Sequence, residues 1–73
     1  MTRTPVLIID DEPGVLEGMR LFLEDEGYDV HEALEAKEGL EVFRSLNPDM
    51  VVTDLRMPGM SGLELIGEIK KIN

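Results

Sequence analysis

The sequence predicts an α/β fold in which three short parallel strands alternate with three helices. Two short apolar runs, Val6-Leu7-Ile8-Ile9 and Met50-Val51-Val52-Thr53, are rich in β-branched residues, and each is followed directly by an aspartate. Runs that are apolar on both sides are typical of buried parallel strands. The segments between and after them carry apolar residues at helical spacing and are joined by short connections, which favours right-handed strand-helix-strand crossovers.

The first half of the chain predicts a strand, a helix and a second strand. Residues 6–9 form the first strand, and Pro13 follows at a position that the first turn of a helix tolerates. Gly27 then ends the helix. Residues 28–33 alternate weakly between apolar and polar, which indicates a second, more exposed strand. The apolar positions of the helix are Val15, Leu16, Met19, Phe22 and Leu23.

The second half predicts a helix, a strand and a last helix. Asn47-Pro48 ends the first of these helices, because the residue before a proline avoids the α region. Residues 50–53 form the third strand, and residues 57–60 place proline and glycine at the centre of a type II turn. Residues 61–64, Ser-Gly-Leu-Glu, form a capping box for the last helix. The apolar positions of the two helices are Ala36, Leu40, Phe43 and Leu46, then Leu65, Ile66, Ile69 and Ile72.

Length and composition limit the chain to one small domain. Its 73 residues contain no cysteine, so disulfides cannot stabilise it, and this composition fits a reducing cytoplasm. No apolar run approaches the length of a membrane span, and no signal-peptide pattern is present. We therefore expect a soluble cytoplasmic chain that makes no contact with a membrane.

The charge is distributed very unevenly. The formal net charge is -9, and residues 10–35 hold ten acidic side chains against one basic one, Arg20. Acidic and basic residues balance over the rest of the chain. Nucleic-acid binding requires a basic face that contacts phosphates, so this segment is not expected to bind nucleic acid.

Three carboxylates follow the two apolar strands. Asp10 and Asp11 come after the first strand and Asp54 after the third, and ligand sites in open parallel sheets lie beyond the carboxyl ends of the strands. At about 4 Å each pair would repel by about 4 kcal/mol at a near-surface effective dielectric. A bound cation removes this cost. Oxygen ligands without cysteine or a nearby histidine favour a hard ion, so we expect Mg²⁺, with Mn²⁺ or Ca²⁺ as alternatives.

Other interpretations of the acids explain less. Asp10, Asp11 and Glu12 could favour a helix N-terminus through capping and the dipole, but this leaves Asp54 unexplained. A flavin or nucleotide binder needs a neutral or glycine-rich loop after the first strand, where these acids would repel a phosphate. An aspartate-nucleophile phosphatase usually has a second aspartate two residues after the first, and this position is Arg56.

Residues 7–13 (Leu-Ile-Ile-Asp-Asp-Glu-Pro) and 52–62 (Val-Thr-Asp-Leu-Arg-Met-Pro-Gly-Met-Ser-Gly) closely resemble the receiver domain of bacterial two-component response regulators. The resemblance runs the length of the chain. It implies phosphoryl transfer to Asp54 from a sensor histidine kinase or a phosphotransfer protein. It also implies that Asp11 binds Mg²⁺ directly, that Asp10 reaches the ion through water, and that Asp54 and the main-chain carbonyl of Arg56 complete the metal site.

The same resemblance implies a flavodoxin-like fold of three layers with strand order 2-1-3. Residues 1–73 then correspond to the N-terminal part of a receiver, without the fourth and fifth strand-helix units. The family's switch Ser or Thr and its Lys have no counterpart here. The domain is expected to be a phospho-accepting signalling domain and not an enzyme.

A third strand at the sheet edge would leave backbone groups of Val51 and Val52 unpaired, which predicts that the chain forms a homo-oligomer. The alternative hypothesis is a non-phosphorylatable structural or assembly fragment that self-associates. His31 belongs to the segment 28–33 of the second strand, away from the acids, and we expect it to be a surface residue and not a phosphodonor.

Overall fold

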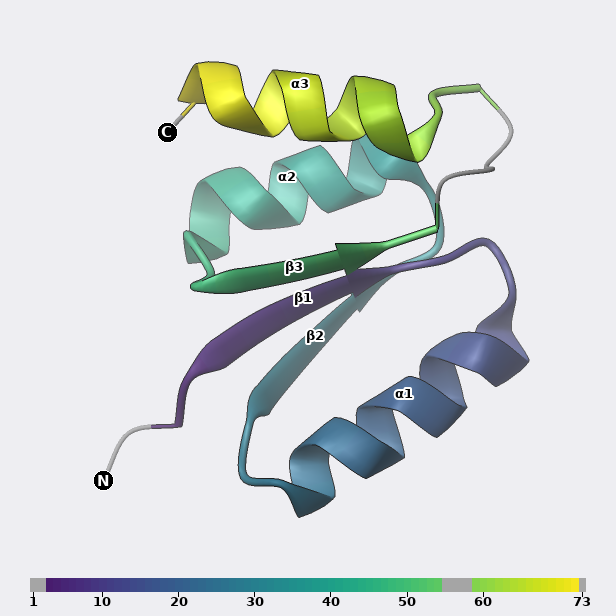
Figure 1. The fold of residues 1–73 in the computed structure, drawn as a ribbon, viewed down its shortest axis with the longest axis vertical. Helices are drawn as coiled ribbons and strands as arrows, with labels where there is room; N and C mark the ends of the chain where they lie inside the picture. The colour runs from purple at the N-terminus through teal and green to yellow at the C-terminus, as the bar shows by residue number, and fades with distance from the viewer. Residues whose placement is uncertain (1–2, 55–58, 73) are drawn as a thin grey trace.

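The fold is a three-stranded parallel sheet covered by helices on both faces (Figure 1). The computed structural model describes residues 3–54 and 59–72. The elements, in chain order, are β1 (Pro5–Ile9), α1 (Pro13–Asp25), β2 (Asp29–Ala33), α2 (Ala36–Leu46), β3 (Met50–Thr53) and α3 (Gly62–Ile72). The predicted order of strands and helices is therefore confirmed.

The strand order in the sheet is β2-β1-β3, as the resemblance implied. Val6 of β1 lies opposite Val30 of β2 and Met50 of β3, and both pairings are parallel. Because β1 has a neighbour on each side and helices on both faces, residues Val6–Ile9 are completely buried. The apolar character of this run on both sides follows from that central position.

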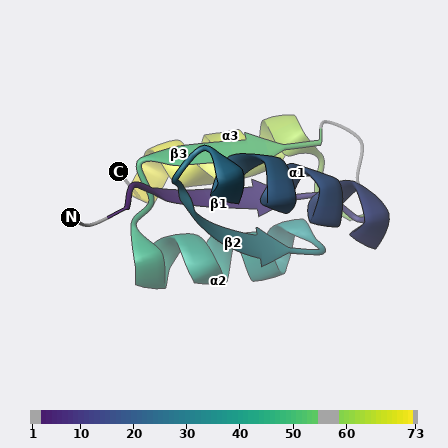
Figure 2. The same ribbon diagram turned by 90° about the horizontal axis from the view of Figure 1, so that it is seen from below.

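Two apolar clusters hold the layers together, one on each face of the sheet. Alternate residues of β1 face opposite sides, so Leu7 and Ile9 pack with α2 and α3, whereas Val6 and Ile8 pack with α1. Figure 2 shows α1 on the face opposite α2 and α3. The larger cluster contains Leu7, Ile9, Ala33, Ala36, Leu40, Phe43 and Leu65, and the smaller contains Val6, Ile8 and Leu16.

A glycine sets the distance between α2 and the central strand. A Cβ atom at Gly39 would lie 2.5 Å from Cδ1 and 3.0 Å from Cγ1 of Ile9. Carbon atoms do not approach so closely without displacement. The absence of a side chain at Gly39 therefore allows α2 to pack directly against the end of β1, close to the acidic residues that follow it.

The predicted helix ends have the backbone geometry that their residues favour. Gly27 has φ +97° after α1, and Asn47 is left-handed with φ 49° after α2. At the start of α3 the Glu64 amide donates to Ser61 Oγ at 3.2 Å and the Ser61 amide donates to Glu64 Oε1 at 3.4 Å, which is the predicted capping box. Gly59 has the positive φ of +85° that a type II turn requires, while the preceding turn residues, 57 and 58, lie outside the described part.

The apolar spacing of α1 overstates how much of the helix is buried. Leu16 is buried, but Val15 is 40% exposed and Phe22 is 66% exposed. These two residues lie on one side of the predicted stripe, whereas Leu16, Met19 and Leu23 pack toward the sheet. Because α1 packs on β1 and β2, part of its apolar surface extends beyond the layer that it covers.

The second strand is an exposed edge, as predicted. In β2 only Ala33 is buried, and Asp29 and Glu32 are exposed. Among residues 3–54 and 59–72, no helix is long and apolar enough to cross a membrane.

Candidate metal centre

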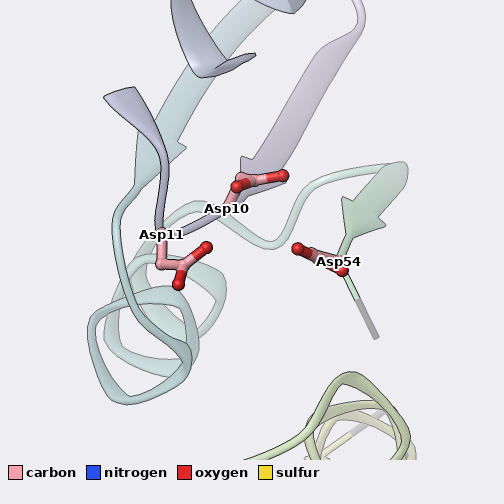
Figure 3. A group of neighbouring side chains, drawn as sticks. All are labelled: Asp10, Asp11 and Asp54. Atoms are coloured by element: carbon pink, nitrogen blue, oxygen red, sulfur yellow. The ribbon is translucent and has the colours of Figure 1, made fainter. Parts of the chain in front are cut away.

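The three predicted carboxylates converge at the carboxyl edge of the sheet. Asp10 and Asp11 follow β1, Asp54 follows β3, and Figure 3 shows their side chains around one space. One oxygen of each carboxylate lies within 4.8 Å of one oxygen of each of the others. Residues more than 40 positions apart in the chain therefore form one cluster because β1 and β3 are adjacent parallel strands.

Backbone hydrogen bonds just beyond the strands fix the main-chain positions of Asp10 and Asp54. The Asp54 amide donates to the Ile9 carbonyl at 3.1 Å, and the Asp10 amide donates to the Ala33 carbonyl at 3.1 Å. Each aspartate thus lies one residue past its strand but still belongs to the hydrogen-bonded ladder. Ligands attached to such a rigid backbone need little reordering to bind an ion.

A local turn orients the Asp10 side chain. The Glu12 amide donates to Asp10 Oδ1 at 2.9 Å, which bends the chain toward the first turn of α1. Asp10 and Asp54 are half-buried and Asp11 is exposed. The cluster therefore has one solvent-facing carboxylate and two that are partly shielded by the strand ends.

The electrostatic cost of the cluster favours a cation. Two unit negative charges at 4.8 Å repel by about 0.9 kcal/mol in bulk water and by about 3.5 kcal/mol at an effective dielectric of 20. Three such pairs share this space. The donor set consists of carboxylate oxygens, so it fits a hard divalent ion such as Mg²⁺ or Ca²⁺ better than a metal that prefers sulfur or nitrogen.

Two other residues considered in the sequence, Arg56 and His31, are not among the described residues of the acidic cluster. Arg56, predicted to supply a carbonyl ligand, lies outside the described residues. His31 is on β2, partly exposed, with its Nε2 3.1 Å from Asp29 Oδ2, and it does not join the acidic cluster.

Arg20, which no sequence pattern assigned to a site, contacts two acidic side chains. Its guanidinium lies 3.3 Å from Glu24 Oε1 on the same helix and 3.1 Å from Glu32 Oε1 on β2. Arg20 is the one basic residue within residues 10–35, and this isolation among acids could have indicated that it forms ion pairs.

Fold and site together define a class of protein: an open-sheet α/β domain with a cluster of acidic side chains at the carboxyl edge of a parallel sheet. Residues 6–73 match the family model described as the response regulator receiver domain, so the chain belongs to that family. The receiver domains of two-component response regulators act in phosphorelay signalling and bind Mg²⁺ at an acidic pocket.

Individual relatives agree with this assignment. The chain is 43% identical over 67 residues to the transcriptional regulatory protein GlrR of Escherichia coli K12, a match that covers 92% of this chain and 15% of GlrR. The response regulator TrrA of Thermotoga maritima, solved in complex with Mg²⁺-BeF, superimposes with a TM-score of 0.92 at 43% identity. That match covers 96% of this chain and 61% of the TrrA chain.

TrrA is also known in complex with the histidine kinase ThkA, and that TrrA chain matches with a TM-score of 0.90 at 43% identity. The match covers 96% of this chain and 60% of the TrrA chain. The chain thus spans about three fifths of the TrrA structures and a much smaller share of GlrR.

Proposed function

We propose that Asp54 is the phosphoacceptor of this receiver and that the donor is a phosphohistidine on a sensor histidine kinase or phosphotransfer protein. The observation that carries the proposal is the meeting of Asp10, Asp11 and Asp54 within 4.8 Å at one edge of the sheet. The complex of ThkA with TrrA supports a kinase as the partner.

The chemistry follows from the positions of the three side chains. A carboxylate oxygen of Asp54 forms a bond to phosphorus while the phosphorus–nitrogen bond of the phosphohistidine breaks, and the bonding electrons remain on the imidazole, which takes up a proton. Asp54 is placed by the strand ladder, so the acceptor oxygen is held at the open edge. Alignment and charge neutralisation account for most of the catalysis of phosphoryl transfer.

We propose Mg²⁺ as the ion, with Mn²⁺ and Ca²⁺ as alternatives. Asp11 would bind it directly, Asp10 through water, and Asp54 and the Arg56 carbonyl would complete the ligand set. When bound, the ion neutralises the negative charge of the acceptor and of the phosphoryl oxygens. The solved complex of TrrA with Mg²⁺-BeF supports this choice of metal.

Phosphodonor labelling tests the acceptor. Incubation with acetyl phosphate and Mg²⁺ should add the mass of one phosphoryl group, and the Asp54→Asn variant should not gain it. Asp49→Asn, which removes an aspartate just before β3, is the matched control and should be labelled like the wild type. Absence of labelling, or labelling that persists in Asp54→Asn, would show that Asp54 is not the acceptor.

We further propose that residues 1–73 act as the N-terminal part of a receiver in the cytoplasm, as a phospho-accepting domain and not as an enzyme. The share of the TrrA chain that is matched supports the first point. Phosphorelay signalling is favoured over the alternative of an assembly fragment that cannot be phosphorylated.

We also propose that the chain forms a homo-oligomer through β3. Among the described residues β3 pairs with β1 on one side, and its Met50 side chain is 41% exposed. Pairing of β3 with a second copy would satisfy backbone groups of this edge. Most of the net negative charge lies in residues 10–35, and β3 itself (Met50–Thr53) carries no charged side chain.

Light scattering at two protein concentrations tests the oligomer. The mass should rise with concentration, and Val52→Pro should lower it, because proline removes a backbone donor. Circular dichroism verifies that this variant is folded. A wild-type monomer at high concentration contradicts the proposal, and a dimer that the folded proline variant retains places the interface elsewhere.

A further inference from the structure

A cavity lies at the same edge of the sheet as the three aspartates, on the side of β2. Its volume is about 310 Å³, at the low end of the range for ligand pockets and suited to a single long side chain. The start of α1, the end of β2 and the first turns of α2 enclose it. Its lining residues are Pro13, Leu16, Glu32, Ala33, Leu34 and Glu38.

The walls are apolar apart from two carboxylates that come from different elements. Glu32 on β2 places Oε1 3.1 Å from Arg20 Nε, and Glu38 on α2 accepts a hydrogen bond from the Leu34 amide at 2.8 Å, also through Oε1. These contacts hold both side chains in place. Within the described part of the chain, the second oxygen of each carboxylate accepts no hydrogen bond, so both can still bind a donor.

The charge and the walls of this cavity indicate which kind of ligand it can bind. The cavity is lined by two acids and no base, and Arg20 contacts one oxygen of Glu32, so the cavity favours a cation over an anion. The apolar walls favour a cation on an aliphatic stem. A guanidinium suits such a cavity better than an ammonium, because it carries several donors in one plane and is more weakly hydrated.

We propose that this cavity binds an arginine side chain of the protein that brings the phosphohistidine to Asp54. The inference rests on the proposed function, since it concerns the partner of that site. The cavity and the acidic cluster are joined by one hydrogen bond, from the Asp10 amide to the carbonyl of Ala33, a residue that lines the cavity. The cavity and the cluster thus lie at adjacent strand ends, where one partner can contact both.

Two short peptides test the site on the intact chain without a phosphodonor. Acetyl-Gly-Arg-Gly-amide carries the cation, and acetyl-Gly-citrulline-Gly-amide is its neutral isostere. Backbone amide shifts in a ¹H–¹⁵N spectrum should move at Leu16, Ala33 and Leu34 and saturate with the arginine peptide. The citrulline peptide should bind roughly two- to fivefold more weakly, the range expected for one partly exposed ion pair.

Two variants test whether the Glu38 carboxylate binds the arginine peptide. Glu38→Gln keeps an oxygen for the Leu34 amide but removes the charge, and it should weaken the arginine peptide by roughly two- to fivefold. Glu17→Gln removes an exposed acid of α1 that does not line the cavity and should leave the affinity unchanged.

Equal binding of both peptides, equal weakening by both variants, or shifts spread over the whole acidic stretch would overturn the inference. Because labelling of Asp54 by acetyl phosphate does not use the cavity, the two proposals can fail separately. Labelling without peptide binding rejects the cavity, and peptide binding without labelling rejects the acceptor.

Discussion

Divalent ions should stabilise the folded chain by binding to the acidic cluster, and this binding should raise Tm. An ion that binds only the folded state at ten times its dissociation constant adds about 1.4 kcal/mol to the free energy of unfolding. For a domain of this size, 1 kcal/mol shifts Tm by roughly 4–8 °C. Addition of Mg²⁺ at this ratio should therefore raise Tm by about 6–11 °C.

The variant Asp11→Asn should change both the metal-free protein and its response to Mg²⁺. Asp11 is exposed, so the water-like limit applies, and loss of two repulsions at up to 4.8 Å is worth about 1–2 kcal/mol. The metal-free variant should thus melt at a higher temperature than the metal-free wild type. The rise in Tm with Mg²⁺ should largely disappear, because a direct ligand of the ion has been removed.

Calorimetry or dye-monitored melting over a Mg²⁺ titration, at constant ionic strength, measures both effects. Glu17→Gln removes one negative charge away from the cluster, as Asp11→Asn does within it, and serves as the control. If Asp11→Asn and Glu17→Gln respond to Mg²⁺ equally, the ion acts by general screening of the acidic stretch. The idea of a specific site at the three aspartates would then be refuted.

Two further predictions concern stability, both measured as the free energy of unfolding in urea. Gly39→Ala should destabilise the fold by about 1–2 kcal/mol, because overpacking against Ile9 outweighs the gain in helix propensity. The control Gly18→Ala has no atom within 4 Å of its added Cβ, so it should stabilise the fold by about 0.5–1 kcal/mol. Equal effects would contradict the close packing of α2. Ser61→Ala should cost about 1 kcal/mol through loss of the cap to Glu64, and an unchanged midpoint would mean that the capping box contributes nothing.

The order and approximate bounds of the elements could be predicted because local signals mark them. Gly27 and Asn47 take left-handed backbone at the expected helix ends, and the Ser61 cap begins α3 as expected. The meeting of Asp10 with Asp54 also followed from the chain, because the carboxyl ends of parallel strands share one edge.

What could not be predicted depends on contacts between distant residues. The exposure of Phe22 is set by how far α1 extends beyond the sheet, and helical spacing carries no information on that. The need for glycine at position 39 arises from the Ile9 side chain on another element. The cavity beside Glu32 and Glu38 likewise exists only once α1, β2 and α2 have packed together.

The central place of β1 has a consequence for amide hydrogen exchange. β1 is bonded on both sides, so its amides should exchange only when the whole domain unfolds, whereas those of the edge strand β3 should also exchange through local opening. Asp10 and Asp11 are attached to the strand that opens last, and Asp54 is attached to one that opens more readily. Among the described residues, we therefore expect the Asp54 amide to exchange faster than the amides of β1, although it donates to the Ile9 carbonyl in the same ladder.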